Sequence, residues 1–315
     1  MGSSIKQPIE SIDRTIDVSR STALKTPTKM SKAREILRKR IDEEILLYYP
    51  DISMYSPEFY ERLLVRWSDD SVFSEKHRYE LIDQFIDNPK EKRFLDMAAG
   101  CGSFVLQGLR NGYNTWGVEP EEWKHDVIDA KFEENDYDKE WRDHIVKGVG
   151  EKLPFEDESF DHFDSWQTIE HVADERDCIH ELYRVLKKGG SGILRGPDYI
   201  CFYEGHYRMF WFPLMGKGKF ARFYLKMRGR PFGGLDTFHP VNPYKTRRYC
   251  REAGFKIIDI KREQIFRAAK RRMPILQKPI FKPALWFIYI GWDMYRGIRY
   301  VGRREATISY LLVKE

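Results

Sequence analysis

The sequence has few of the features that place a protein in a membrane or in an oxidising compartment. No apolar run reaches the roughly 20 residues that a membrane-spanning helix needs, and the nearest approach, Ala284–Trp292, ends at Asp293. The first residues lack the apolar core of a secretory signal. The four cysteines show no CxxC spacing, which argues against a zinc site or a disulfide framework. We therefore expect a cytoplasmic protein with reduced thiols and no bound metal.

Acidic residues are scarce in the C-terminal third of the chain. The net charge is only +5, but residues 216–305 hold 23 Lys and Arg against 6 Asp and Glu. These residues therefore carry a net charge of +17, and the rest of the chain carries a net charge of −12. The pattern predicts a basic C-terminal face, which is either a solvated surface or a contact for an anionic partner.

The chain divides into three parts. Residues 1–29 are rich in Ser, Thr and Lys without apolar periodicity, which predicts a flexible tail. Residues 30–90 contain helical patterns from Ser31 to about Leu47, after Ser56 and over 75–86, which predict an N-terminal helical cap. Residues 91–315 form the main domain.

Short apolar strands alternate with helices in the main domain. Strands are expected at 94–98, 115–119, 144–147, 160–166, 191–196, 255–265 and 306–313. The alternation is typical of an α/β fold with a largely parallel sheet and helices on both faces. Two aromatic and basic insertions interrupt it at about 198–240 and 267–303, and we expect them to fold into a cap over the strand ends.

A turn of small residues follows the first strand. Ala98, Gly100 and Gly102 precede a helix, so the backbone can approach a ligand closely and offer N–H groups to it. Glu119 ends the next strand, where a carboxylate can accept hydrogen bonds from both ribose hydroxyls. Asp96 precedes the turn and would repel a diphosphate, which favours a ligand with an ammonium and a sulfonium group over a dinucleotide.

These residues resemble the class I S-adenosylmethionine (SAM)-dependent methyltransferases. Residues 96–102 (DMAAGCG) resemble motif I of that family, and 117–120 (GVEP) resemble its acidic second-strand motif. The segments 151–155 (EKLPF), 159–161 (SFD), 169–172 (IEHV) and 182–190 (LYRVLKKGG) are similar to the UbiE/UbiG-like, or type 11, branch. The resemblance implies a Rossmann-like seven-stranded methyltransferase sheet, with SAM as cofactor.

The resemblance also implies roles for individual residues. Asp96 would lie near the methionine amino group, Glu119 would bind the ribose, and Pro120 would lie against adenine. The other residues expected around the cofactor are Ala98, Gly100, Gly102, Val149, Gly150, Glu151, Gln167 and Thr168. Val149 stands where many relatives have an Asp that pairs with adenine, so the adenine contact would depend on backbone groups and apolar packing.

We expect the segment after the fifth strand to form the wall of the site that binds the methyl acceptor, because ligands bind beyond the carboxyl ends of strands in doubly wound sheets. His206 is the first candidate for a general base, and Glu204 or His171 would orient or replace it. His239 is a further candidate. The alternative is that these groups only hold the insertion in place by hydrogen bonds.

The expected reaction is O-methylation of a small molecule, a glycan or an isoprenoid-type lipid. An RNA or protein methyltransferase and a non-catalytic SAM-binding module are the alternatives. Nucleic acid is a disfavoured partner, because residues 165–168 (SWQT) occupy the place of the Asn/Asp-Pro-Pro-Tyr/Phe motif of RNA amino-group enzymes. The aromatic and basic C-terminal segments suit a substrate cap, a homodimer contact, a contact with a membrane or a lipid-linked acceptor, or single-stranded RNA.

Overall fold

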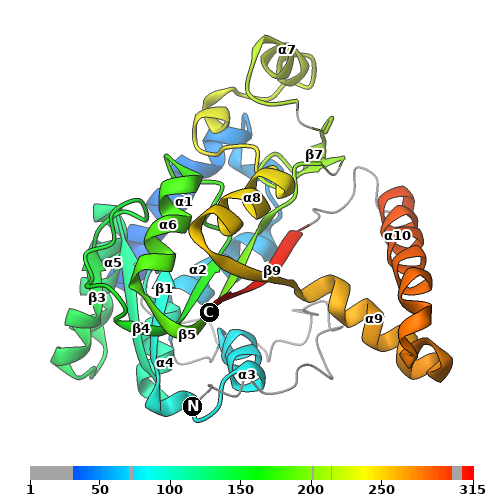
Figure 1. Ribbon diagram of the computed structural model, residues 1–315. Coiled ribbons are helices and arrows are strands. Elements are labelled where there is room, and N and C mark those ends of the chain that lie inside the picture. The colour runs from blue at the N-terminus through cyan, green and yellow to red at the C-terminus, as the bar shows by residue number, and fades with distance from the viewer. Residues whose placement is uncertain (1–30, 71–73, 201, 214, 300–306) are drawn as a thin grey trace.

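The computed structural model describes residues 31–70, 74–200, 202–213, 215–299 and 307–315 (Figure 1). The predicted tail, residues 1–29, lies outside the described residues. So does the end of the second predicted insertion, beyond residue 299.

One seven-stranded sheet forms the centre of the molecule. Its strand order is β3-β2-β1-β4-β5-β9-β8. The strands β1 (Arg93–Met97), β2 (Asn114–Glu119), β3 (Ile145–Lys147), β4 (Phe160–Trp166) and β5 (Leu186–Pro197) run parallel. The strand β9 (Thr307–Lys314) runs antiparallel between β5 and β8 (Phe255–Asp259). The predicted α/β class with a seven-stranded sheet is confirmed.

Helices cover both faces of the sheet, because alternate residues of each buried strand point to opposite sides. Leu95 and Met97 share a core with α6 (Glu175–Val185), whereas Phe94 packs with Tyr79 of α3 (Lys76–Phe85) on the other face. In Figure 1, α6 and α8 (Pro243–Ala253) lie together in front of the sheet, and α3 lies below. The helix α4 (Ser103–Arg110) connects β1 to β2, and α5 (Glu122–Glu134) lies between β2 and β3.

The N-terminal cap consists of α1 (Lys32–Tyr48), α2 (Pro57–Ser68) and α3. The Ser31 hydroxyl accepts a hydrogen bond from the Arg34 N–H at 3.2 Å and caps α1. The apolar face of α1, which includes Leu37 and Ile41, is buried, and α1 packs against α2 and α5. Short 3₁₀ turns occur at η1 (Ile52–Met54), η2 (Pro89–Glu91), η3 (Lys139–His144), η4 (Gly233–Asp236), η5 (Pro274–Gln277) and η6 (Pro279–Phe281).

The first insertion contains a short hairpin and one helix. The hairpin pairs β6 (Tyr203–Glu204) with β7 (Met209–Phe210). The helix α7 (Lys219–Met227) stands at the top of Figure 1.

The second insertion begins earlier than predicted. The strand expected over 255–265 ends at Asp259, because the Asp259 carboxylate accepts a hydrogen bond from the Arg262 N–H at 2.9 Å and caps α9 (Ile260–Arg272). The chain then continues into α10 (Lys282–Arg299), at the right of Figure 1. Within the described residues, every helix is too short or too polar to cross a bilayer.

Candidate functional site

The turn after β1 has the backbone conformation that its small residues favour. Ala98, Gly100 and Gly102 all have positive φ angles, at 65°, 57° and 77°. A Cβ on Gly102 would lie 2.8 Å from Ile145 Cδ1, so this position has no room for a side chain. A Cβ on Gly100 would meet no atom within 4 Å, so the turn is open on that side. The N–H groups of Ala99, Gly100 and Gly102 donate within the chain, so the turn offers a ligand a close approach to its backbone at Gly100.

Glu119 faces this turn from the end of β2. Its side chain is fully buried, and it accepts hydrogen bonds from the N–H groups of Gly100 at 2.8 Å and Glu121 at 3.1 Å. Lys124 Nζ lies 3.2 Å from its Oε1 atom. Each carboxylate oxygen has two lone pairs. These contacts therefore orient the carboxylate toward the turn and leave it capacity to accept further hydrogen bonds.

The Asp96 side chain faces α3. Its carboxylate is 2.5 Å from Nη2 of the buried Arg78 on α3, and Nε of the same guanidinium is 2.7 Å from Asp164. Asp96 points this way because it shares a strand face with Phe94, and α3 covers that face. Burial raises the pKa of Asp96 to about 7, although Arg78 opposes this shift. The carboxylate is therefore engaged by Arg78, and its place near the methionine amino group stays a prediction.

Of the residues expected to contact adenine, some are exposed and one contacts a neighbouring loop. Val149 is exposed, as is Pro120 after β2. The Glu151 carboxylate accepts hydrogen bonds from the N–H groups of Ala173 at 2.5 Å and Asp174 at 3.1 Å. Glu151 therefore holds the loop before α6, which leaves Pro120, Val149 and the backbone at Gly150 as surfaces for a flat ring.

The loop after β4 joins the turn to a cavity. Thr168 is buried, and its hydroxyl lies 3.2 Å from the Met97 carbonyl oxygen at the end of β1. Gln167 has a positive φ of 52°, an uncommon conformation for a residue with a side chain, and its N–H donates to the Arg195 carbonyl. Gln167, Glu170 and His171 line one wall of the cavity.

The cavity has a volume of about 330 Å³, and the N-terminal cap forms most of its walls. Its aromatic lining residues are Tyr48, Tyr49, Tyr55, Phe59 and Trp67, and Ile41, Ile45 and Leu63 add aliphatic surface. Glu44 from α1 is a polar member of the wall, and the reduced hydration there raises the pKa of its carboxyl group. None of these cap residues was predicted as part of the site, since their helical spacing indicates only a packed face.

His206 and Glu204 form an ordered pair at this cavity. His206 Nδ1 lies 2.7 Å from Glu204 Oε1, and the Glu204 side chain is fully buried. Glu204 is held in turn by the Tyr207 N–H at 2.5 Å and the Tyr199 hydroxyl at 3.2 Å. The His206 ring stacks between Tyr48, at a centroid distance of 5.5 Å, and Phe238, at 4.9 Å. The predicted base and its predicted partner are thus brought together.

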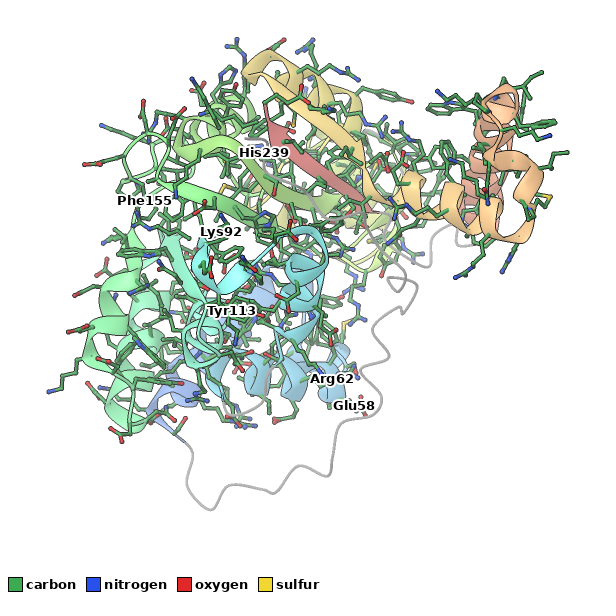
Figure 2. All side chains as sticks on the ribbon, turned by 60° about the horizontal axis from the view of Figure 1, so that its bottom comes forward. Glu58, Arg62, Lys92, Tyr113, Phe155 and His239 are labelled. Carbon is green, nitrogen blue, oxygen red and sulfur yellow. The ribbon has the colours of Figure 1, made fainter. Side chains whose placement is uncertain are left out.

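The other two histidines differ in their placement. His171 lines the cavity, its ring lies 5.3 Å from that of His206, and its Nδ1–H donates to the Thr237 carbonyl at 2.7 Å. Desolvation lowers the pKa of His171 to about 4, so its ring is neutral at physiological pH. His239 is labelled in Figure 2. Its side chain is exposed and absent from the cavity lining, and its backbone N–H donates to the Glu170 carbonyl. In the part of the chain that the structure describes, no three His, Cys, Asp or Glu side chains are grouped to hold a metal ion.

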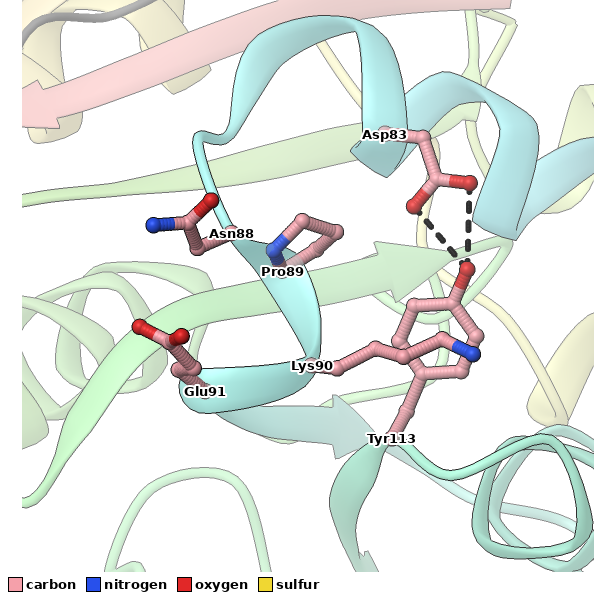
Figure 3. Close-up of a pocket in the computed structure, with 6 residues that line it drawn as sticks. All are labelled: Asp83, Asn88, Pro89, Lys90, Glu91 and Tyr113. Atoms are coloured by element: carbon pink, nitrogen blue, oxygen red, sulfur yellow. Dashed lines mark hydrogen bonds between the residues drawn. The ribbon is translucent and has the colours of Figure 1, made fainter.

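A second hollow, of about 440 Å³, lies at the other end of the strands (Figure 3). Two residues that line it lie just before strands: Lys90 is in η2, ahead of β1, and Tyr113 directly precedes β2. The Tyr113 hydroxyl lies 2.9 and 3.0 Å from the two carboxylate oxygens of Asp83. Because ligands of doubly wound sheets bind at the carboxyl ends of the strands, the candidate site is the turn, Glu119 and the aromatic cavity.

Part of the chain is similar to known methyltransferases. A family model described as a methyltransferase domain matches residues 95–194. The uncharacterised methyltransferase YcgJ of Bacillus subtilis is 28% identical over 128 residues, which are 41% of this chain and 49% of that protein. The demethylmenaquinone methyltransferase of a Geobacillus species is 31% identical over 127 residues, 37% of this chain and 50% of that protein.

Among solved structures, phosphoethanolamine N-methyltransferase 2 of Haemonchus contortus, in complex with SAM, is similar in fold. It has a TM-score of 0.49 and 16% identity, and the match covers 92% of this chain and 61% of that one. The chain spans about half the length of the two curated relatives named above. Residues 95–194 belong to the methyltransferase domain family, and this chain therefore contains a class I SAM-dependent methyltransferase domain.

Proposed function

We propose that the turn after β1 and Glu119 bind SAM. The residues present fit this cofactor, because the turn is open beside Gly100 and a buried carboxylate with spare lone pairs faces it. Gly100 and Gly102 would let the cofactor lie close against the backbone of the turn, and Glu119 would accept hydrogen bonds from the ribose. Pro120, Val149 and Gly150 would contact adenine, and Gln167 and Thr168 would lie toward the methionine part.

We propose further that the chain transfers the methyl group to a hydroxyl group of an acceptor in the aromatic cavity. SAM, when bound, supplies a methyl group on a positively charged sulfur, an electrophile that needs no further activation. A hydroxyl acceptor must lose its proton, and the observation that carries this proposal is the His206–Glu204 pair at the cavity wall. With a proton fixed on Nδ1 by Glu204, Nε2 is the basic nitrogen of the neutral ring, and it can accept that proton.

The lining indicates the shape of the acceptor more than its charge. Glu44 and Glu170 line the cavity, and the guanidinium groups of Arg208 and Arg230 stack on the lining residues Phe59 and Tyr49, at 4.8 and 4.2 Å from the ring centroids. Charges of both signs therefore lie near the cavity, and an uncharged ring or chain would pack on the aromatic wall. The proposed acceptor is a small neutral molecule or an isoprenoid-type lipid with a hydroxyl group.

Calorimetric titration of the full chain with SAM tests the cofactor site. The change Glu119→Gln should weaken SAM binding by about 1–3 kcal/mol, roughly 5- to 150-fold in Kd, because the ribose hydroxyls lose a charged acceptor. The control Glu133→Gln, in the last turn of α5, should leave the Kd unchanged, since Glu133 is exposed and pairs with Lys32. An unchanged Kd for Glu119→Gln would refute the ribose assignment, and the absence of any binding to the wild type would refute the proposed activity.

A further inference from the structure

The helices α9 and α10, with η5 and η6 between them, form an arm at the side of the domain (Figure 1). One face of α10, which includes Leu285 and Ile288, packs with Ala269 of α9 and Leu276 of η5 in a small separate core. This small core buries only the face of α10 that is turned toward α9 and η5.

The outer face of α10 is apolar and open. Phe287 and Ile290 lie on the side of the helix opposite Leu285 and Ile288, according to the 3.6-residue period. Trp286 lies at the margin of this face, where its half-exposed ring also contacts Phe266 and Arg262 of α9. Phe287 is 75% exposed, and Trp286 and Ile290 are 47% and 48% exposed. The connection between the helices adds further exposed apolar side chains, namely Met273, Ile275 and Ile280. The surface of a water-soluble protein rarely exposes so many large apolar side chains together unless they bind a partner.

The same arm is strongly basic. Residues 260–292 contain eight Lys and Arg and only one acidic residue, Glu263. Arg271 and Arg272 end α9, and Lys278 and Lys282 lie beside the exposed apolar residues; all four side chains are exposed. Two copies of so positive a surface would repel each other if they met face to face. The charge therefore favours an anionic partner over a second copy of this chain.

We propose that the arm docks on an anionic lipid surface, with α10 lying in the plane of the membrane interface. Aromatic and aliphatic side chains on one face of a helix enter the boundary between headgroups and acyl chains, and the basic side chains contact anionic headgroups. The length and composition of α10 suit a helix that lies on a bilayer and do not suit one that crosses it. The proposal is independent of which molecule accepts the methyl group.

Flotation of the full chain with lipid vesicles tests the proposal. The wild type should float with vesicles that contain phosphatidylglycerol and remain largely free with pure phosphatidylcholine. The double change Phe287→Glu and Ile290→Glu should reduce the bound fraction about ten-fold or more, and so should Arg271→Glu with Arg272→Glu. Trp fluorescence of the wild type should shift to the blue on binding, since Trp286 and Trp292 lie on the arm.

A matched control separates the arm from the other exposed basic helix. The double change Phe220→Glu and Phe223→Glu removes equally exposed side chains from α7, and we expect it to leave vesicle binding within about two-fold of the wild type. Unchanged SAM affinity would show that each variant is folded. The proposal is overturned if the wild type does not bind anionic vesicles, if the arm variants float as the wild type does, or if the α7 variant alone loses binding. It is also overturned if light scattering shows a wild-type dimer that the Phe287→Glu and Ile290→Glu variant converts to a monomer.

Discussion

Replacing His206 with Ala is expected to slow methyl transfer by about 10²–10⁴-fold, because the acceptor hydroxyl then loses its proton without a positioned base. SAM affinity should stay near the wild-type value, since His206 lies at the aromatic cavity and not at the turn after β1. The measurement is transfer of radiolabelled methyl from SAM to neutral phenols and isoprenoid hydroquinones. Any acceptor that the wild type methylates serves for the comparison.

Two further variants distinguish a base from a merely structural histidine. Free imidazole should restore part of the rate of His206→Ala, which it would not do if the ring only held the insertion in place. The change Glu204→Gln should also lower kcat, because the amide cannot stabilise a protonated His206 as a carboxylate does. His239→Ala serves as the control and should react at the wild-type rate, since His239 is exposed outside the cavity. A normal rate for His206→Ala would return His206 to a structural role.

Replacing Arg78 with Met is expected to destabilise the fold by about 3–5 kcal/mol, because it leaves Asp96 and Asp164 buried without their cation. Denaturant unfolding, followed by circular dichroism, measures this loss. Arg66→Met is the matched control: Arg66 pairs with Glu75, as Arg78 does, but its side chain is 43% exposed. That variant should lose no more than about 1 kcal/mol. A small effect of Arg78→Met would mean that the buried ion pairs contribute little.

The effect of Arg78→Met should depend on pH in a defined direction. Burial already raises the native pKa of Asp96 to about 7, and loss of the guanidinium should raise it further. A carboxyl with a native pKa above its unfolded value of about 4 binds more protons in the folded state, so stability falls as pH rises between those values. The difference in unfolding free energy between Arg78→Met and the wild type should therefore become smaller at acidic pH and larger above neutral pH. A difference that is constant with pH would contradict this account of Asp96.

The sequence alone predicted those features that depend on residues close together in the chain. The strands around the turn and the α/β class follow from alternating apolar segments, and the positive φ angles at Gly100 and Gly102 follow from glycine itself. The pairing of His206 with Glu204 was also predictable, because both residues lie in one short segment beyond β5. The strand that ends at Asp259 was predicted too long, since an apolar run does not show where a capping carboxylate stops it.

Contacts between distant segments were not predictable in the same way. Whether Asp96 faces a ligand or a helix depends on where Arg78, 18 residues earlier, is placed by the packing of α3. The aromatic wall of the cavity comes from α1, α2 and the segment between them, whose residues show only helical periodicity and aromatic content in the sequence. A period of 3.6 residues identifies a buried face but not the partner that buries it.

The position of β9 has a consequence for the synthesis of this protein. Val313 pairs with Ser191, and β9 separates β5 from β8, although it is the last of these strands to leave the ribosome. Until then, β5 is an unpaired sheet edge beside the strands β1 to β4. Such edges promote aggregation, and pairing over so long a loop is slow. We therefore expect yield during expression to be limited by this closing step, and to improve with slower translation or added chaperones.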